Sequence, residues 1–439
     1  MLSHLFLRSL YKFLRKPHFG GWNRSSNAGI IKVRTQQQGS KQGSELSSFS
    51  TRLRIYTCAL RKGEIVRLIT GIDTAMPDVK RKWNYHAAWN QNDRLWREDF
   101  RQLADCGFDL LRWQAPWSLV QPKQGEYRWE TIDPQVELAT KLGLEIFYPI
   151  VHFNLPSWLA SNGEKHAVFA DQLPDRIAEY TDRLLTRYRF RLVIPVVEVQ
   201  MDAFQRGRVG NWQPHGKSAS SYAAIYERLV HAYKASARVA KMHGATVFCS
   251  EPATEIQTVL DLSDVTDIAG IDLYPHMHQQ RSIIGFFRWW WHTAHMPLCI
   301  SEFGTPETYD PDTQVDEFNK FIPAGVHDNR IATARLLADA LRQAKEEGIP
   351  VPFGGWYPGT GNIGWGFSLT KERKLADCDR AGLVDLARQK DGTLQRVLCH
   401  DLVHEILGLR NLDTPSAPEF ATVPSIPAFA AAAASASGD

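Results

Sequence analysis

An α/β fold is predicted for this chain, more specifically a single-domain (β/α)8 barrel, and three observations support that prediction. Eight short apolar segments alternate with amphipathic segments over about 350 residues, as in βαβ units with a parallel sheet. Eight such units favour a closed barrel over an open sheet. No GxGxxG or GxxxxGK(S/T) loop follows any apolar segment, which counts against a nucleotide-binding open sheet.

Composition narrows the functional classes. The chain has 439 residues, is 44% hydrophobic and 23% charged, and carries a net charge of +3, which is too close to neutral to indicate nucleic-acid binding. No apolar run is long enough for a membrane span. The six cysteines are far apart and form no CxxC pair, so the sequence predicts no disulfide framework, no metal site, no cofactor and a reducing compartment.

The two ends of the chain have compositions unlike the middle. Residues 1–55 are basic and contain no acidic residue before Glu45, which fits an organellar transit peptide, a disordered basic tail or an upstream start codon. We expect a barrel over 60–410 and a disordered Ala/Pro-rich tail over 413–439. The expected location is cytoplasmic, or organellar if residues 1–50 are a transit peptide; the oligomeric state is left open.

The predicted strands are short, apolar and rich in β-branched and aromatic residues. In chain order they are Ile65–Ile72, Phe108–Trp113, Leu144–His152, Leu192–Val199, Ala245–Ser250, Ile268–Tyr274, Leu298–Ile300 with its end at Glu302, and Val351–Tyr357.

The predicted helices carry apolar residues at helical spacing, and several stop at a glycine. They cover residues 93–106, 132–142, 172–188, 220–242, 254–262, 282–295, 329–347 and 393–406.

In a barrel of parallel strands, side chains at the carboxyl ends of the strands meet at one face. Glu302 follows the buried segment Leu298–Ile300, where a carboxylate is costly unless it is paired or used. Other polar or aromatic residues end the remaining strands, and they are Arg112, His152, Asn154, Glu198, Glu251, Asp272, Tyr274, Trp356, Tyr357 and Trp365. Glu302 as a helix cap or ion-pair partner is the structural alternative, and Glu251 and Asp202 compete with Glu198.

Two carboxylates facing each other across a barrel suit glycosidic bond cleavage, since one donates a proton to the leaving oxygen and the other attacks the anomeric carbon. Aromatic rings and hydrogen-bonding groups around them suit sugars. A buried core role remains the alternative for the tryptophans, and an ion pair or a satisfied core histidine remains the alternative for Arg112 and His152.

Several motifs make this expectation more specific. The tracts "PWSLVQP", "VHFNLPSWL", "IAGIDLYP", "SEFGT" and "GNWQPH" are similar to segments of family 1 glycoside hydrolases, and more broadly of their clan of retaining (β/α)8 enzymes. The resemblance covers about residues 66–400 and implies a β-glucosidase-like hydrolase acting on a carbohydrate or glycoside. It implies Glu302 as the nucleophile and Glu198 as the acid/base.

The same resemblance implies substrate-binding roles for the polar and aromatic residues at the other strand ends, namely Arg112, His152, Asn154, Tyr274, Trp356 and Trp365. The chain also departs from the family pattern. Val197 replaces the asparagine before the acid/base, the strand-one glutamine is not evident, and Gly364 stands where a sugar-binding glutamate is expected. These losses leave open a catalytically impaired barrel that binds carbohydrate or a partner protein, and the early tracts leave open a neighbouring family of the clan.

Overall fold

The structure is a computed structural model that describes residues 66–79, 82–159, 171–275, 281–305, 329–362 and 381–411. The two predicted tails lie outside these residues. None of the described helices is both long and apolar enough to cross a membrane.

Nine of the described strands form one parallel sheet in the order β7-β6-β5-β4-β1-β11-β10-β9-β8. The strands in chain order are β1 (Arg67–Gly71), β4 (Leu110–Arg112), β5 (Glu145–Val151), β6 (Leu192–Val196), β7 (Thr246–Val247), β8 (Glu251–Pro252), β9 (Ala269–Leu273), β10 (Leu298–Phe303) and β11 (Phe353–Trp356).

The sheet closes into a barrel because two short strands, β7 inside the predicted fifth strand Ala245–Ser250 and β8 directly after it, stand at the two ends of this order. β7 pairs with β6 and β8 pairs with β9. Between them, the Phe248 amide donates to Val193 and the Cys249 amide donates to Ile268. Gly270 permits this close approach, since a Cβ there would lie 2.1 Å from the Cys249 carbonyl oxygen. The predicted (β/α)8 barrel is therefore confirmed.

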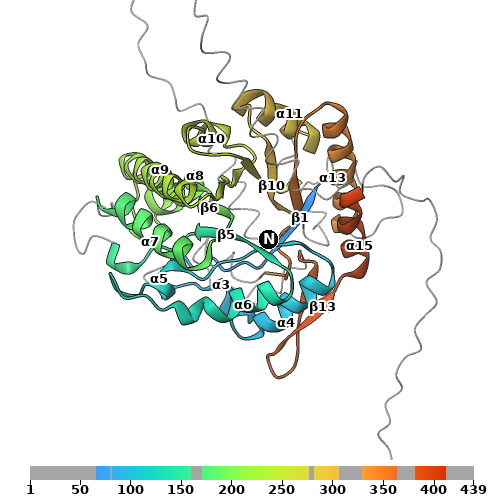
Figure 1. Cartoon of the computed structure of the whole chain (residues 1–439), viewed down its shortest axis with the longest axis horizontal. Coiled ribbons are helices and arrows are strands. Elements are labelled where there is room, and N and C mark those ends of the chain that lie inside the picture. The colour runs from blue at the N-terminus through green and yellow to red at the C-terminus, as the bar shows by residue number, and fades with distance from the viewer. Residues whose placement is uncertain are drawn as a thin grey trace, which may run out of the picture.

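Helices follow the strands and surround the barrel (Figure 1). The longer ones are α4 (Asn92–Asp105), α6 (Asp133–Lys141), α7 (Leu173–Tyr188), α9 (Ala219–Met242), α10 (Ile256–Leu262), α11 (Ile283–Ala294), α13 (Asn329–Glu346) and α15 (His400–Gly408). Shorter elements, none of them predicted, are β2 (Asp78–Val79), β3 (Lys82–Trp83), α3 (His86–Trp89), α5 (Trp117–Val120), α8 (Val199–Ala203) and the π-helical η3 (Phe204–Val209).

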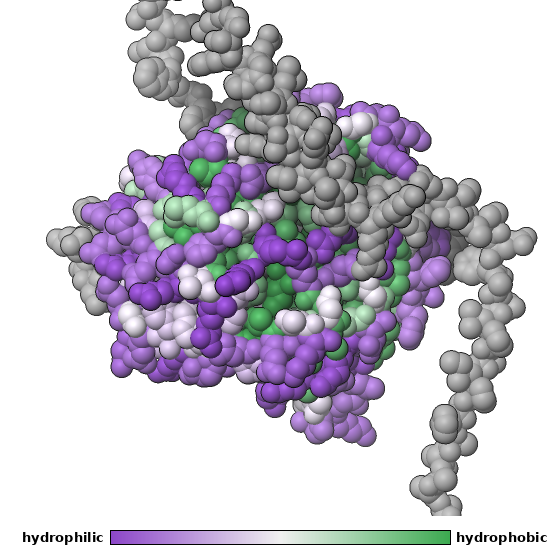
Figure 2. All heavy atoms as spheres, in the orientation of Figure 1, coloured by the Kyte–Doolittle hydropathy of each residue, from purple (hydrophilic) through white to green (hydrophobic). Residues whose placement is uncertain are grey.

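Both faces of the strands are buried, so neighbouring residues belong to different parts of the core. Ile69 and Leu110 lie in the cluster inside the barrel, while Leu68 and Leu111 belong to the layer between strands and helices. The outer surfaces of the helices are mainly hydrophilic, and apolar side chains gather toward the middle of the face in Figure 2. Burial of both strand faces explains why the strands are apolar throughout instead of alternating between apolar and polar residues.

The predicted closing helix over 393–406 is wrong in its first half. β12 (Val384–Arg388) and β13 (Leu394–Leu398) form an antiparallel hairpin, and only α15 continues as a helix. The turn contains Gly392 with φ +85°, a conformation that favours glycine. Burial along β13 alternates with the two-residue period of a strand. Leucine spacing suggested a helix here, and the Asp-Gly turn was the competing signal.

Candidate active site

Predicted site residues from five strands meet at the carboxyl end of the barrel. Arg112 ends β4, His152 follows β5, and Glu302 is the penultimate residue of β10. Tyr274 follows β9, and Glu198 lies two residues after β6. The strand ends thus bring together residues that are up to 190 positions apart in the chain, as in the Arg112–Glu302 ion pair.

A bulge in β10 turns Glu302 into the barrel. Ile300 pairs with Ile271, but Glu302 pairs with Asp272, so Ser301 is an extra residue. Strict alternation from Cys299, which lies inside the barrel, would have pointed Glu302 outward. With the bulge, Glu302 faces the interior and Phe303 joins the outer layer.

Two donors hold the Glu302 carboxylate. The Arg112 guanidinium donates to Oε1 at 2.5 Å, and the Tyr274 hydroxyl donates to Oε2 at 2.5 Å. Burial alone would lower the pKa of Arg112, but the Glu302 charge beside it raises that pKa above its ordinary value. Arg112 therefore stays cationic and stabilises negative charge on Glu302. Both donors were predicted to lie in this pocket.

Glu198 lies at the start of α8 rather than on a strand, because β6 ends earlier than predicted, at Val196. Its φ of 47° and ψ of 60° place it in the left-handed region, which costs a non-glycine residue about 1–2 kcal/mol. Its amide donates to the Ser250 carbonyl at 2.7 Å, which fixes this conformation. Strained backbone of this kind is concentrated at functional sites.

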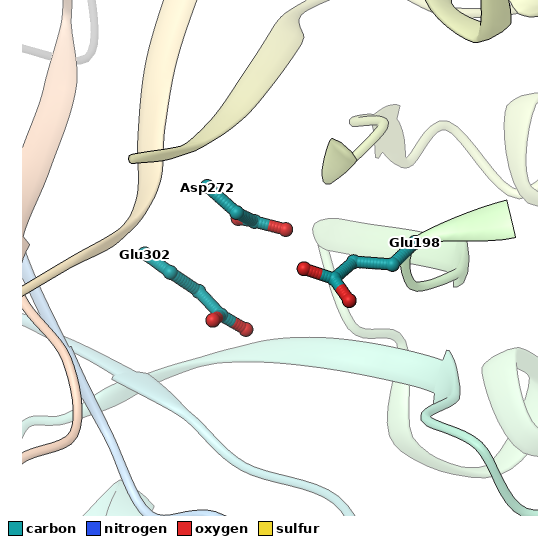
Figure 3. Close-up of side chains that lie close together, drawn as sticks. All are labelled: Glu198, Asp272 and Glu302. Carbon is teal, nitrogen blue, oxygen red and sulfur yellow. The ribbon is translucent and has the colours of Figure 1, made fainter. Parts of the chain in front are cut away.

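Three carboxyl groups point toward one another from three different elements (Figure 3). One oxygen each of Glu198, Asp272 and Glu302 lies within 4.8 Å of the other two. Burial, followed by the nearby charges of Asp272 and Glu302, raises the pKa of Glu198 well above its ordinary value. Glu198 therefore keeps its proton to higher pH than an ordinary glutamate, while the Glu302 carboxylate accepts hydrogen bonds from Arg112 and Tyr274.

Asp272 was noted at the end of a strand but was not among the predicted site residues. Its carboxyl accepts hydrogen bonds from the hydroxyls of Ser250 at 2.8 Å and Ser301 at 2.7 Å. Burial and the charge of Glu302 raise its pKa to about 7. The sequence signal was the alternation of β9, since Gly270 and Asp272 share the inward face.

The carboxyl trio is also close enough to hold a divalent cation, which the sequence did not predict. Arg112 already supplies a positive charge beside Glu302. Acidic groups at this spacing are not by themselves a metal centre.

Glu251, the competitor of Glu198, has a different environment. It is fully buried and its Oε1 accepts a hydrogen bond from the Val199 amide at 2.9 Å. Burial raises its pKa well above the ordinary value. This contact joins β8 to the start of α8, so Glu251 supports the segment that carries Glu198. The other competitor, Asp202, is buried in an ion pair with Arg206 at 2.5 Å.

His152 is buried beside a second polar group. Burial and the positive charge of Arg112 lower its pKa to about 3, so the imidazole is neutral. Nearby, Asp73 contacts His86 at 2.9 Å and accepts a hydrogen bond from Asn362. Asp73 and His86 follow β1, where the expected glutamine is missing, and sequence reasoning overlooked both.

The remaining predicted residues lie differently from expectation. Asn154 is fully buried; its side-chain oxygen accepts a hydrogen bond from the Ser118 amide at 2.8 Å, and its side-chain NH2 donates to the Met76 carbonyl at 3.0 Å. Trp356 is fully buried in the outer layer, with its indole N–H donating to the Ala381 carbonyl at 2.8 Å. In this structure Asn154 and Trp356 hold loops in place. Trp365 lies outside the described residues.

Tyr357, one position after Trp356, is the strand-eight aromatic that contacts Arg112, the partner of Glu302. The Arg112 guanidinium lies over its ring at 4.7 Å from the centroid. Tyr357 was noted at the end of its strand, but Trp356 was chosen for substrate binding. Alternation places Phe353 inside the barrel and Trp356 outside, which could have directed the choice.

Comparison with known proteins gives one family model and a set of similar folds. Residues 85–193 match the family model for beta-galactosidase of glycoside hydrolase family 42, which spans the chain from α3 to β6. No curated protein sequence matches the chain.

The similar solved structures include a β-glucosidase and a β-glycosidase. The family 1 β-glucosidase from Thermotoga maritima has a TM-score of 0.60 at 14% identity, over 80% of this chain and 98% of that chain. The AHE enzyme from Alicyclobacillus herbarius has a TM-score of 0.61 at 13% identity, over 79% and 97%. The β-glycosidase BGL167 has a TM-score of 0.53 at 18% identity, over 76% and 89%.

At these identities the structural likeness shows the fold. With the family-model match, it relates the chain to the (β/α)8 glycoside hydrolases, which confirms the resemblance predicted from the motifs at the level of the clan. The narrower assignment to family 1 is not confirmed, since the matched model describes family 42.

Proposed function

We propose that the protein is a retaining β-glycosidase that hydrolyses O-glycosidic bonds by double displacement. The observation that carries this proposal is the pair of glutamates whose carboxyl oxygens lie within 4.8 Å of each other in contrasting environments. Retaining enzymes separate the two carboxyl groups by about 5–5.5 Å, and inverting enzymes by about 6.5–9.5 Å to admit a water. The short distance between Glu198 and Glu302 supports retention.

In the first step, a Glu302 oxygen bonds to the anomeric carbon while the bond to the leaving oxygen breaks. Glu198 transfers its proton to that oxygen, so the aglycone leaves as a neutral alcohol. The raised pKa of Glu198 suits this role, because the group must still carry its proton near neutral pH.

In the second step, Glu198 accepts a proton from water, and the resulting hydroxide equivalent attacks the anomeric carbon and releases Glu302. Bonding of Glu302 to the sugar removes one of the negative charges that face Glu198. The proton affinity of Glu198 therefore falls, and Glu198 can act as the base in this step. Arg112 and Tyr274 receive the charge that returns to Glu302.

We assign a β-glucoside as the preferred substrate, following the family 1 motifs, and treat a β-galactoside as the direct competitor because of the family 42 match. Neutral His152 and the Asp73–His86–Asn362 group supply hydrogen-bonding partners for sugar hydroxyls beside the carboxylates. A comparison of kcat/KM on aryl β-glucosides and β-galactosides decides between them.

A catalytically impaired barrel that binds carbohydrate is the second candidate. The observation in its favour is Val197, which is fully buried inside the barrel directly before Glu198 and offers no polar contact to a sugar hydroxyl. Loss of a contact that strengthens in the transition state lowers the rate more than the affinity.

The test is intact mass after incubation with activated 2-fluoro glycosides of glucose, galactose, mannose and xylose. We expect a mass gain of one sugar in wild type and none in Glu302→Gln. Glu137→Gln, the same substitution on an exposed helix residue paired with Lys141, is the matched control and should behave as wild type. No adduct with any probe on folded protein would favour the binding-only barrel. An adduct that persists in Glu302→Gln would mean that another residue is the nucleophile.

A further inference from the structure

Asp272 is a carboxylate that the proposed double displacement does not use. It is 1% exposed and lies on the inward face of β9, directly opposite Glu302 in the register of β9 and β10. Figure 3 shows it beside Glu302, with its carboxyl group aimed at Glu198, which approaches from the opposite side. A third buried carboxyl group at this position needs a physical reason, because like charges at such short range oppose one another.

The hydroxyls around Asp272 are arranged to stabilise its negative form. Ser250 and Ser301 both donate to it, and neither hydroxyl contributes a negative charge. Ser301 is the bulge residue that turns Glu302 inward, and the Ser250 carbonyl accepts from the Glu198 amide. The two serines therefore connect Asp272 mechanically to the backbone of both glutamates.

We propose that Asp272 is a positioning residue whose carboxylate, held by Ser250 and Ser301, keeps the proton on Glu198. This inference rests on the proposed function, since it assigns Glu198 the role of proton donor. The groups that face Glu198 are Asp272 from β9, Glu302 from β10, Glu251 from β8 and Arg112 from β4. Of these, Glu302 loses its charge when it bonds to the sugar and Asp272 does not.

The order of ionisation fits this role. Asp272 has a pKa of about 7 and ionises before Glu198, whose pKa is raised well above its ordinary value. Once Asp272 is charged, it opposes the loss of the Glu198 proton. The protonated acid then persists to higher pH than it would beside a neutral residue.

The experiment is a carbon-13 NMR titration of full-length protein labelled at the glutamate side-chain carboxyl carbons. Comparison with Glu198→Gln identifies the Glu198 resonance. In Asp272→Asn we expect its midpoint to fall by about one pH unit or more, because the repelling charge is gone. Asp272→Glu keeps the charge and should restore the midpoint toward wild type. Asp264→Asn, on a surface aspartate paired with Lys234, is the matched control and should leave it unchanged.

An unchanged or higher Glu198 midpoint in Asp272→Asn would overturn the proposal. Asp272→Ser is a second neutral variant that gives the same test should the asparagine variant fail to fold. The activity readout is the pH profile of kcat/KM on an aryl glycoside, whose alkaline limb should move to lower pH, whereas a merely structural role would lower the rate at every pH. If wild type cleaves no glycoside, the proposed function fails, while the NMR midpoints still decide the role of Asp272.

Discussion

At the scale of single residues, the Glu302 carboxylate is held by two hydrogen-bond donors. Glu302 receives one hydrogen bond from Arg112, at the end of β4, and one from Tyr274, just after β9. A charge-assisted hydrogen bond of this kind contributes about 1.5–3 kcal/mol. Removal of Tyr274's hydroxyl should therefore affect Glu302 in the reaction more than it affects folding.

Tyr274→Phe should lower kcat on an aryl glycoside by about 10- to 100-fold, because charge returning to Glu302 loses one donor. The melting temperature should change by only a few degrees, since the ring and its packing remain. Steady-state kinetics with thermal melts measure both. Tyr226→Phe, on a hydroxyl that donates to Asp261 at 2.7 Å away from the site, is the control and should keep wild-type kcat. Equal rates in Tyr274→Phe and wild type would contradict the role of this hydroxyl.

Strand ends explain which residues could be found from the sequence. Glu302, Arg112 and Tyr274 all lie at or next to strand ends, and counting apolar segments placed them correctly. Asp272 and Tyr357 have the same type of position, yet choosing them required the inward phase of each strand. Alternation shows which residues of a strand share a face, but the face that points inward depends on the register with the neighbouring strands.

At the scale of elements, the β12–β13 hairpin is joined to the barrel by a buried ion pair. Arg396 in β13 donates to Asp99 in α4 at 2.8 Å, and it also donates to the carbonyls of Asn90 and Leu394. Both side chains of the pair are almost fully buried. Loss of one partner leaves a buried charge without compensation, which costs about 3–5 kcal/mol.

Arg396→Met should lower the free energy of unfolding by about 3–5 kcal/mol. The double variant Arg396→Met with Asp99→Leu should recover much of this loss, because no isolated charge remains. Urea unfolding monitored by circular dichroism measures both. A double variant as unstable as the single one would show that the ion pair contributes more than its own desolvation cost.

Two element-scale features explain the errors of prediction. The bulge at Ser301 adds one residue without altering the apolar pattern of Leu298–Ile300, so nothing in the sequence marks it. The hairpin over 384–398 was missed because Leu394, Val397 and Leu398 also suit a helical face. Tertiary contacts, here Arg396 with Asp99, selected the strand.

At the scale of the whole molecule, the closed barrel buries ionisable groups whose pKa values differ from those of the unfolded chain. His152 has an ordinary value of 6.5 and about 3 in the fold, because burial and Arg112 oppose its charge. The unfolded chain therefore binds more protons than the folded protein between those values. Stability is fully present above pH 6.5 and is lost as pH falls toward 3.

At pH 5 this single histidine should cost about 2 kcal/mol relative to pH 7. His152→Gln cannot titrate, so its melting temperature should fall less between pH 7 and pH 5 than that of wild type. His243→Gln, on a half-exposed histidine bonded to Asp182, is the matched control. Parallel pH dependence in wild type and His152→Gln would contradict a neutral buried His152.

The architecture was the most predictable feature at this scale, because eight alternating segments leave few alternatives to a barrel. The division of this part of the chain into β7 and β8 was not predictable. It depends on the contact between Gly270 in β9 and the carbonyl of Cys249, which lies between β7 and β8. Substrate preference belongs to loops whose shapes follow from such contacts rather than from periodicity.

The assignment of Glu302 as nucleophile is tested most directly by locating the trapped sugar. After reaction with an activated 2-fluoro glucoside, the protein is digested and the modified peptide is sequenced by tandem mass spectrometry. We predict one sugar on the peptide that contains Leu298–Phe303, attached at Glu302. A sugar attached at Glu198, Asp272 or Glu251 would contradict the account.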